Sequence, residues 1–342
     1  MNCRRRLTTA IMKPNPLGCE PQRLAAIDIG TNTFRLLIAD VRRVRGNNYN
    51  IKEIFSDRIV TRLGEGIAKT GLLNKTAISR GISALKRFRS IISRHHVYRT
   101  CVAATSALRD AKNKKTFLKK AEKKTGFKIE IISGKEEAKK TSSGMLTGIN
   151  PAGAALMIDI GGGSTELIFI KNKKTLLVNS LNLGVVYLAE KYMKNDPPLK
   201  EDLSRMSGEI FRKIKPLIKS FTKLFSGKTV LIGTAGTVTT LAAIKKRLTR
   251  FEQSKIHNSK ITLEKIRRIF YDISTVSAKE RIRYHPFDPT RLDIIVPGTL
   301  ILITLMESLG FKEIIVSNYG LREGIIIDLY NKVYPVRRAK VY

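Results

Sequence analysis

The sequence predicts an α/β protein built from two related lobes with a cleft between them. Apolar segments typical of strands alternate with amphipathic, helix-like segments along the chain. The motif Ile-Asp-Ile-Gly at 27–30 recurs at 158–161, and a repeat of domain size indicates duplicated lobes rather than a solenoid, whose period is about 20–50 residues. The 342 residues, 42% of them hydrophobic, suffice for two domains with their own cores.

The first lobe begins with two apolar segments that we expect to pair as a hairpin, because Gly30 interrupts them. Asn74 or Thr76 is a plausible N-cap for the first long helix. The expected helices cover 73–92 and 113–124, and the expected strands cover 24–29, 34–41, 49–61, 100–105 and 127–132.

The second lobe repeats the opening hairpin and then becomes mainly helical. Its hairpin carries Leu167 and Ser164 where the first has Leu36 and Thr33. The expected strands cover 156–160, 166–170, 229–232 and 314–317, and the expected helices cover 198–225, 238–246, 263–274, 299–309 and 321–330.

The charge balance is strongly basic, and it bears on the choice of partners. Sixty-four Lys and Arg residues oppose 28 Asp and Glu, a net charge of +36. Such a field attracts polyanions, although the charge also suits a solvated surface. No helix-turn-helix, RNP or basic-zipper pattern is present, so nucleic acid is not expected as the primary partner. No apolar run approaches the ~18 residues of a membrane span. We therefore expect a cytoplasmic protein without a membrane partner.

The first glycine loop, at 30–33, has the composition of an anion-binding turn. It offers Gly30 for a tight turn and the side chains of Thr31, Asn32 and Thr33 as donors. Asp28 ends the preceding strand and can hold Mg²⁺ or a metal-bound water. An ordinary hairpin turn remains the alternative for this loop.

The second glycine loop is more specific. Gly161, Gly162 and Gly163 precede Ser164, and three glycines in succession indicate a close approach of the backbone to a phosphate. Asp159 and Glu166 flank this turn. We expect the two carboxylates to reach one metal ion from its two sides.

A third loop joins a strand to a helix and completes the predicted phosphate cradle. It carries Gly233, Thr234, Gly236 and Thr237, and either threonine can cap the helix, whose free N–H groups attract phosphate. It lacks the lysine of a P-loop.

A catalytic base is expected just after a capping box. Ser133 and Glu136 match that box, which leaves Glu137 free to point into the cleft and take a proton from water. Arg109 is a candidate phosphate clamp, and Arg35 and Arg291 are weaker candidates for the same work. A surface salt bridge is the alternative for each arginine.

Eight stretches, in order from about 24 to about 328, resemble the exopolyphosphatase/guanosine pentaphosphate phosphohydrolase family. They are AAIDIGTNTFRLLI, RLGEGIAKTG, ATSALRDAKN, IEIISGKEEA, IDIGGGSTEL, GTAGTVTTLAAI, DPTRLDIIVPG and YGLREG. The resemblance implies the actin-like fold of the sugar kinase/Hsp70/actin superfamily, with two ribonuclease-H-like lobes. It implies Mg²⁺-dependent hydrolysis of the terminal phosphoryl group of polyphosphate or guanosine pentaphosphate.

The same resemblance assigns roles to individual positions. It implies that Glu137 is the catalytic base and that Arg35 and Arg291 contact guanosine penta- or tetraphosphate. It matches Asp159, Gly161 and Glu166 to the family's phosphate- and metal-binding loop. Lys139, Tyr187 and Asn318 depart from residues frequent in the family, and these departures bear on substrate preference.

The expected organisation has four parts. Residues 1–22 form a basic, disordered extension, 23–135 with about 318–335 form the first lobe, 136–317 form the second, and 336–342 form a basic tail. The last helix is expected to pack on the first lobe, as the family suggests.

Two other functions remain open from sequence. An ATP-dependent small-molecule kinase uses the same superfamily fold, although it generally lacks the Glu-Glu-Ala and Thr-Ser-Ala-Leu-Arg-Asp motifs. A non-enzymatic polyphosphate or guanosine tetraphosphate sensor is the third alternative. The sequence does not rank polyphosphate against guanosine pentaphosphate, and it leaves the oligomeric state open, a homodimer included.

Overall fold

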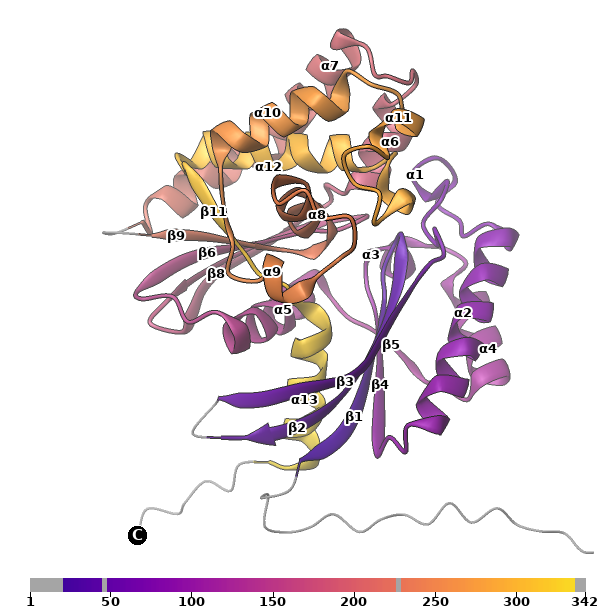
Figure 1. The fold of residues 1–342 in the computed structure, drawn as a ribbon. Coiled ribbons are helices and arrows are strands. Elements are labelled where there is room, and N and C mark those ends of the chain that lie inside the picture. Colours follow the sequence, from indigo (N-terminus) through magenta and orange to yellow (C-terminus); the bar gives the residue numbers. More distant parts are fainter. Residues whose placement is uncertain (1–20, 45–47, 226–228, 336–342) are drawn as a thin grey trace, which may run out of the picture.

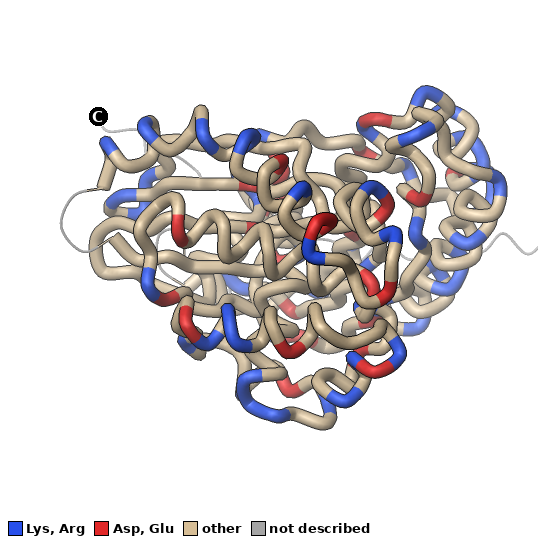
Figure 2. The backbone as a smooth tube through the Cα atoms, turned by 90° about the horizontal axis from the view of Figure 1, so that it is seen from above, with Lys and Arg blue, Asp and Glu red and all other residues tan. Residues whose placement is uncertain are grey.

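The computed structural model describes residues 21–44, 48–225 and 229–335. The chain forms two lobes, each built on one mixed β-sheet with helices packed against it (Figure 1). The expected extension at 1–22 and tail at 336–342 lie almost entirely outside the described residues. Lysine and arginine recur on all sides of the backbone, and acidic residues are fewer (Figure 2).

The first sheet has five strands in the order β3-β2-β1-β4-β5. The opening hairpin pairs β1 with β2 antiparallel, β3 extends it, and β4 and β5 continue in parallel on the other side of β1. The strands are β1 (Gln22–Ile29), β2 (Thr33–Arg43), β3 (Tyr49–Val60), β4 (Arg99–Ala104) and β5 (Ile129–Ile131).

The second sheet repeats this plan, with the order β10-β11-β9-β6-β7-β8. β6 takes the place of β1, with the antiparallel strands β7 and β8 on one side and the parallel strands β9 and β11 on the other. β10 is an added antiparallel edge strand. The predicted duplicated, actin-like α/β fold is therefore confirmed. The strands are β6 (Ala154–Ile160), β7 (Thr165–Lys171), β8 (Lys174–Leu181), β9 (Val230–Thr234), β10 (Lys260–Thr262) and β11 (Glu313–Val316).

Long helices cover the sheets and short ones connect them. In the first lobe they are α1 (Ile67–Thr70), α2 (Lys75–Arg94), α3 (Ser106–Asp110) and α4 (Lys114–Thr125), with α5 (Gly134–Gly148) following. Later in the chain come α6 (Val185–Tyr192), α7 (Lys200–Thr222), α8 (Ala235–Lys245), α9 (Gln253–Ile256), α10 (Leu263–Ser274), α11 (Ala278–Arg281), the 3₁₀ turn η1 (Pro289–Arg291), α12 (Ile295–Leu309) and α13 (Leu321–Val333). No helix in these described stretches is long and apolar enough to cross a bilayer.

Two of the three predicted helix caps are confirmed, and one is wrong. The side chain of Asn74 accepts a hydrogen bond from Ala77 N at the start of α2. Ser133 and Glu136 form the expected capping box of α5. Thr234 occupies the N-cap position of α8 without a side-chain cap. Its hydroxyl donates instead to the carbonyl of Tyr319, a partner that lies 85 residues away in sequence.

Helices α5 and α13 cross in close contact and join the lobes. Ala138 and Met145 of α5 pack with the second sheet, whereas Ile325 and Ile326 of α13 pack with the first. A Cβ atom on Gly144 would lie 1.9 Å from the carbonyl oxygen of Gly320, and one on Gly324 would lie 1.8 Å from the carbonyl oxygen of Lys140. Because no side chain fits there, the two glycines set the distance between the helices.

Replacing Gly324 with alanine is expected to push α5 and α13 apart. Overpacking of this kind typically costs about 1–3 kcal/mol. Gly208 of α7 is the matched control, since a Cβ there meets nothing within 4 Å, and alanine in a helix is favoured over glycine by about 0.5–1 kcal/mol. Thermal denaturation of both variants should show a lower Tm for Gly324→Ala and an unchanged or higher Tm for Gly208→Ala. An equal rise in both would contradict the close crossing.

Candidate active site

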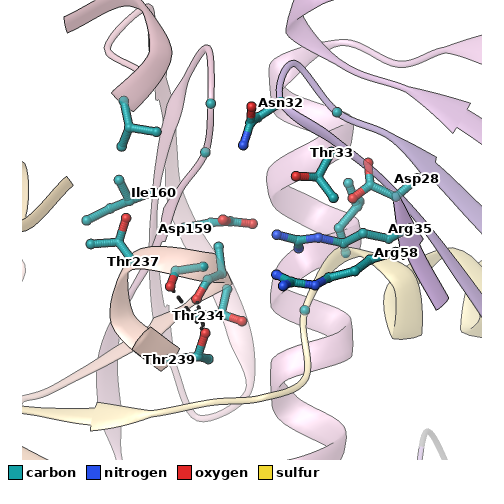
Figure 3. A pocket seen from close by; sticks show the side chains of 18 of the residues that line it. Asp28, Asn32, Thr33, Arg35, Arg58, Asp159, Ile160, Thr234, Thr237 and Thr239 are labelled. Atoms are coloured by element: carbon teal, nitrogen blue, oxygen red, sulfur yellow. Dashed lines mark hydrogen bonds between the residues drawn. The ribbon is translucent and has the colours of Figure 1, made fainter. Parts of the chain in front are cut away.

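A cavity of about 480 Å³ lies between the lobes, and residues of both line it. Three glycine-containing loops meet there: 30–33 of the first lobe, and 161–164 and 234–237 of the second. The side chains of Asn32, Thr33 and Arg35 extend from the first lobe toward Asp159 and Thr237 of the second (Figure 3). The duplicated loops of the sequence thus meet at one site.

The two duplicated loops close in the same way. Gly30 N donates to the carbonyl of Thr33 at 3.2 Å, and Gly161 N donates to the carbonyl of Ser164 at 2.9 Å. A Cβ on Gly30 would approach Thr33 O to 2.9 Å. The absence of a side chain therefore permits this tight turn, and each turn directs polar groups at the cavity.

Close approach of the loops explains the extra glycines of the second copy. A Cβ on Gly163 would lie 2.2 Å from the hydroxyl oxygen of Ser106 and 2.7 Å from that of Thr31. These two hydroxyl groups are hydrogen-bonded to each other at 2.7 Å. The backbone amides of Val185 and Val186 in α6 fix the second loop by donating to Gly161 and Gly162.

The third loop presents the N-terminus of α8 to the cavity. Thr234, Gly236 and Thr237 line it, whereas Gly233 lies behind them. Ala235 has φ 65°, a left-handed conformation that is strained for a residue with a side chain. Strain of this kind is common at functional sites. The free N–H groups of a helix N-terminus favour a bound anion.

Four carboxylates gather where the lobes meet: Asp28, Glu137, Asp159 and Glu166. Burial raises the pKa of Asp28 to about 6, against the pull of Arg35. Burial and the neighbouring Asp159 raise the pKa of Glu166 to about 8. The pKa of Asp159 is also raised by burial. Burial therefore favours the protonated, neutral forms of these carboxyl groups, and the neighbouring Arg35 and Arg109 only partly oppose it.

These carboxylates suit a hard cation, although they do not form a complete cage. Within the described ranges, no group of three or more His, Cys, Asp or Glu side chains is placed to hold a metal ion by itself. Mg²⁺ usually keeps several waters and takes one or two carboxylates plus substrate phosphates. Asp28 and Asp159 line the cavity and fit that pattern.

Glu166 lies apart from the cavity surface. It pairs directly with Asp159 across β6 and β7 and accepts a hydrogen bond from the hydroxyl of Ser180 at 2.8 Å. Its side chain is buried and does not line the cavity. A shared metal ion between Asp159 and Glu166 stays a prediction.

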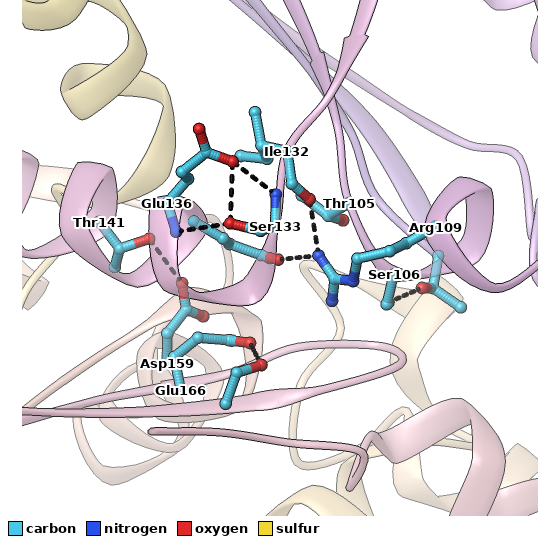
Figure 4. Close-up of polar contacts among 12 residues, drawn as sticks. Thr105, Ser106, Arg109, Ile132, Ser133, Glu136, Thr141, Asp159 and Glu166 are labelled. Atoms are coloured by element: carbon cyan, nitrogen blue, oxygen red, sulfur yellow. Dashed lines mark hydrogen bonds and ion pairs between the residues drawn. The ribbon is translucent and has the colours of Figure 1, made fainter. Parts of the chain in front are cut away.

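Glu137 is placed as the sequence predicts, in the first turn of α5 and on the cavity wall. Glu136 is engaged in the capping box, where it accepts from the amide and hydroxyl of Ser133 at 2.8 Å (Figure 4). Burial, reinforced by Glu166, raises the pKa of Glu137 well above its ordinary value, while Arg109 opposes this rise. A carboxylate with a raised pKa is a better proton acceptor near neutral pH.

Arg109 takes a position that the sequence did not indicate. It does not line the cavity. Its Nη1 donates to Glu137 Oε2 and to the carbonyl of Ile132, both at 3.0 Å (Figure 4). Arg109 therefore orients Glu137, and its predicted contact with phosphate stays untested.

Arg35 and Arg291 both line the cavity, and so do three residues that sequence reasoning missed. Arg58 lies directly across from Arg35 in the register of β2 and β3. Its side chain extends beside that of Arg35 (Figure 3). Ser106 and Asp288 are the other two missed residues. Register between neighbouring strands was the available signal for Arg58.

Known proteins resemble this chain along most of its length. A sequence profile described as the Ppx/GppA phosphatase family matches residues 38–333. Exopolyphosphatase 2 of Mycobacterium tuberculosis is 30% identical over 319 residues, which cover 90% of this chain and 98% of that protein. Guanosine-5'-triphosphate,3'-diphosphate pyrophosphatase of Photobacterium profundum is 28% identical over 322 residues, which cover 94% of this chain and 61% of that protein.

A solved structure shows the same fold. The crystal structure of the Ppx/GppA family member from Aquifex aeolicus superposes with a TM-score of 0.74 at 30% identity. The match covers 92% of this chain and 99% of that one.

The carboxylate cluster predicts an unusual pH dependence of stability in metal-free protein. The folded-state pKa of Asp28, about 6, and that of Glu166, about 8, exceed their unfolded values of about 3.9 and 4.3. Their contribution to stability is therefore full below pH ~4 and is lost as the pH rises through about 6 and about 8. Tm should fall from pH 5 to pH 9 in EDTA.

Asp28→Asn should remove the part of this fall that occurs near pH 6. Glu264→Gln, on the exposed face of α10, is the control and should follow the wild-type curve. Added Mg²⁺ should raise Tm more at pH 9 than at pH 5. A Tm that rises with pH in EDTA would contradict the raised pKa values.

Proposed function

The chain belongs to the Ppx/GppA phosphatase family, whose named relatives are hydrolases of phosphoric anhydrides, and from this membership we propose its reaction and substrates. The proposed reaction is hydrolysis of the terminal phosphoryl group of inorganic polyphosphate, of guanosine pentaphosphate, or of both. One observation carries the proposal: the buried carboxylate of Glu137 lies on the wall of a cavity lined by three anion-binding loops.

The loops are proposed to hold the terminal phosphates. The two duplicated turns and the start of α8 line the cavity, and the amide groups of glycine turns and helix N-termini bind phosphate oxygens well. The hydroxyl groups of Thr31, Thr33 and Thr237 add donors. Positioning and charge stabilisation supply most of the catalysis in phosphoryl transfer.

Glu137 is proposed to act as the general base. It accepts a proton from water as the water oxygen attacks the terminal phosphorus, and the bond from that phosphorus to the bridging oxygen breaks. The products are orthophosphate and a chain shorter by one phosphate. Arg109 keeps the carboxylate oriented through its hydrogen bond to Oε2.

Magnesium is the proposed cofactor, and Asp28 and Asp159 would hold it, with Glu166 behind them. When bound, the ion supplies positive charge to the phosphate oxygens. The raised pKa values of the carboxylates support this assignment, because a bound cation would stabilise the ionised forms that burial disfavours.

Phosphate release from both substrates, measured side by side with Mg²⁺ and without any acceptor, tests the reaction and ranks the substrates. Release without an acceptor also separates hydrolysis from kinase activity. Tight binding without release from either substrate would favour a sensor and contradict the proposal.

Glu137→Gln should lower kcat by about 10²- to 10⁴-fold, the usual contribution of a general base. Glu136→Gln is the matched control, since it changes the adjacent residue in the same way. It should lose capping stability but keep kcat within a few-fold. Equal activity of Glu137→Gln and wild type would refute the role of Glu137.

Arg109→Gln removes the cation that lowers the pKa of Glu137. The acidic limb of the pH–kcat profile should therefore move to higher pH. Arg109→Lys should leave the acidic limb close to its wild-type pH, because lysine keeps the positive charge. If Arg109 acted on phosphate alone, KM would rise in Arg109→Gln while the acidic limb stayed in place.

A further inference from the structure

Three arginines line the cavity, and two of them share an acidic partner that lies outside the carboxylate cluster. Arg35 and Arg58 come from neighbouring strands of the first lobe, and Arg291 ends η1 in the second. Arg35 has no carboxylate within ion-pair distance in the described part of the chain. Asp288 is the acidic residue that pairs with the other two.

The contacts of Asp288 span the cleft. One oxygen, Oδ2, accepts a hydrogen bond from Arg58 Nη1 at 2.6 Å and forms an ion pair with Arg291 Nε at 2.6 Å. The other, Oδ1, accepts from the hydroxyl of Thr290 at 2.5 Å. Only 5% of the Asp288 side chain is exposed. This carboxylate therefore links β3 of the first lobe to η1 of the second.

The region around Arg58, Arg291 and Asp288 carries more positive than negative charge. Two guanidinium groups, those of Arg58 and Arg291, share one carboxylate there, and Arg35 adds a further positive charge near Arg291. Arg291 also packs over the first turn of α8, where a Cβ on Gly236 would lie 1.2 Å from its Nη1. A helix N-terminus carries partial positive charge, so it is an unfavourable neighbour for a cation. Burial and the proximity of Arg35 lower the pKa of Arg291 to about 10.

A phosphate group offers these arginines a stronger partner than one carboxylate. Guanidinium binds phosphate oxygens in bidentate fashion, and the α8 N-terminus favours an anion at the same place. An incoming phosphate and Asp288 cannot both hold the donors of Arg58 and Arg291 that Oδ2 now occupies. Binding through those two donors requires exchange of one anion for the other.

We propose that Asp288 is an internal counter-ion that the anionic substrate displaces from Arg58 and Arg291. In this role Asp288 lowers the affinity of the cleft for polyanions, and its displacement breaks an ion pair between the lobes. The inference rests on the proposed function, in which a chain of phosphates enters this cleft.

Asp288→Asn tests the inference, since it keeps the side-chain shape and removes the charge. Tripolyphosphate binding is measured by calorimetry in the Glu137→Gln background, so that no turnover occurs. The Kd for tripolyphosphate should fall by at least roughly fivefold, because a charge-assisted competitor is lost. The same change in the active protein should lower KM for guanosine pentaphosphate.

Asp293→Asn is the matched control. Asp293 lies five residues further along the same segment and forms an ion pair, at 2.9 Å, with Arg62 of the first lobe. It does not line the cavity. This variant should change the Kd less than twofold. Weaker binding by Asp288→Asn, or equal tightening by Asp293→Asn, would overturn the proposal.

A second variant decides the matter if Asp288→Asn does not fold. Under the proposal Arg58 turns from Asp288 to the ligand, so Arg58→Gln should weaken tripolyphosphate binding and lower the slope of log Kd against log salt by about one. Arg62→Gln should leave the slope unchanged. An unchanged slope in Arg58→Gln would overturn the proposal.

The proposed function fails separately from this inference. If wild-type protein released no phosphate from either substrate, the reaction would be wrong, while the Kd comparison would still decide the role of Asp288. If phosphate were released and Asp288→Asn behaved like Asp293→Asn, the reaction would stand and the inference would fall.

Discussion

The close crossing of α5 and α13 is the contact on which the site depends. Gly144 and Gly324 let the two backbones touch, and each helix packs on a different sheet. Both helices also reach the cavity, α5 through Glu137 and α13 through Arg322. The joint between the lobes and the candidate base therefore belong to one helix, so a change in lobe spacing acts directly on the position of Glu137.

The cavity wall carries groups of both acidic and basic side chains, an arrangement that the net charge of +36 does not reveal. Carboxylates gather where β1 and β6 end, and Arg35 lies beside Asp28 in the register of β1 and β2. Arg58 and Arg291 also line the cavity and share the carboxylate of Asp288. A phosphate chain carrying a cation would offer the carboxylates a positive partner and the arginines a negative one. Lys and Arg residues are spread along the backbone (Figure 2), and the net charge of +36 gives a diffuse positive field that speeds the arrival of anions without choosing among them.

Sequence reasoning found the parts of the site that depend on local chemistry. The glycine turns follow from backbone sterics, and Glu137 followed from the capping duty of Glu136. The pairing of Arg109 with Glu137 depends on tertiary contacts between α3 and α5, and so could not be read locally. Long periodic helices such as α10 were predicted with correct bounds. The edge strand β8 was not predicted, because its exposed half shows little alternation of apolar and polar residues. Helix α6 was not predicted either, because eight residues are too few for a clear helical periodicity.

The two glycine loops close by the same hydrogen bond, yet they differ where they face each other. Thr31 and Ser106 occupy the space into which a side chain at Gly163 would project. Two identical copies of the first loop could not meet at this distance, because both would bring side chains to the same volume. The internal symmetry of the chain must therefore break at the surface where its halves touch. Glycine at position 163 is therefore a geometric requirement for the two loops to approach each other this closely. This requirement holds whatever the substrate is.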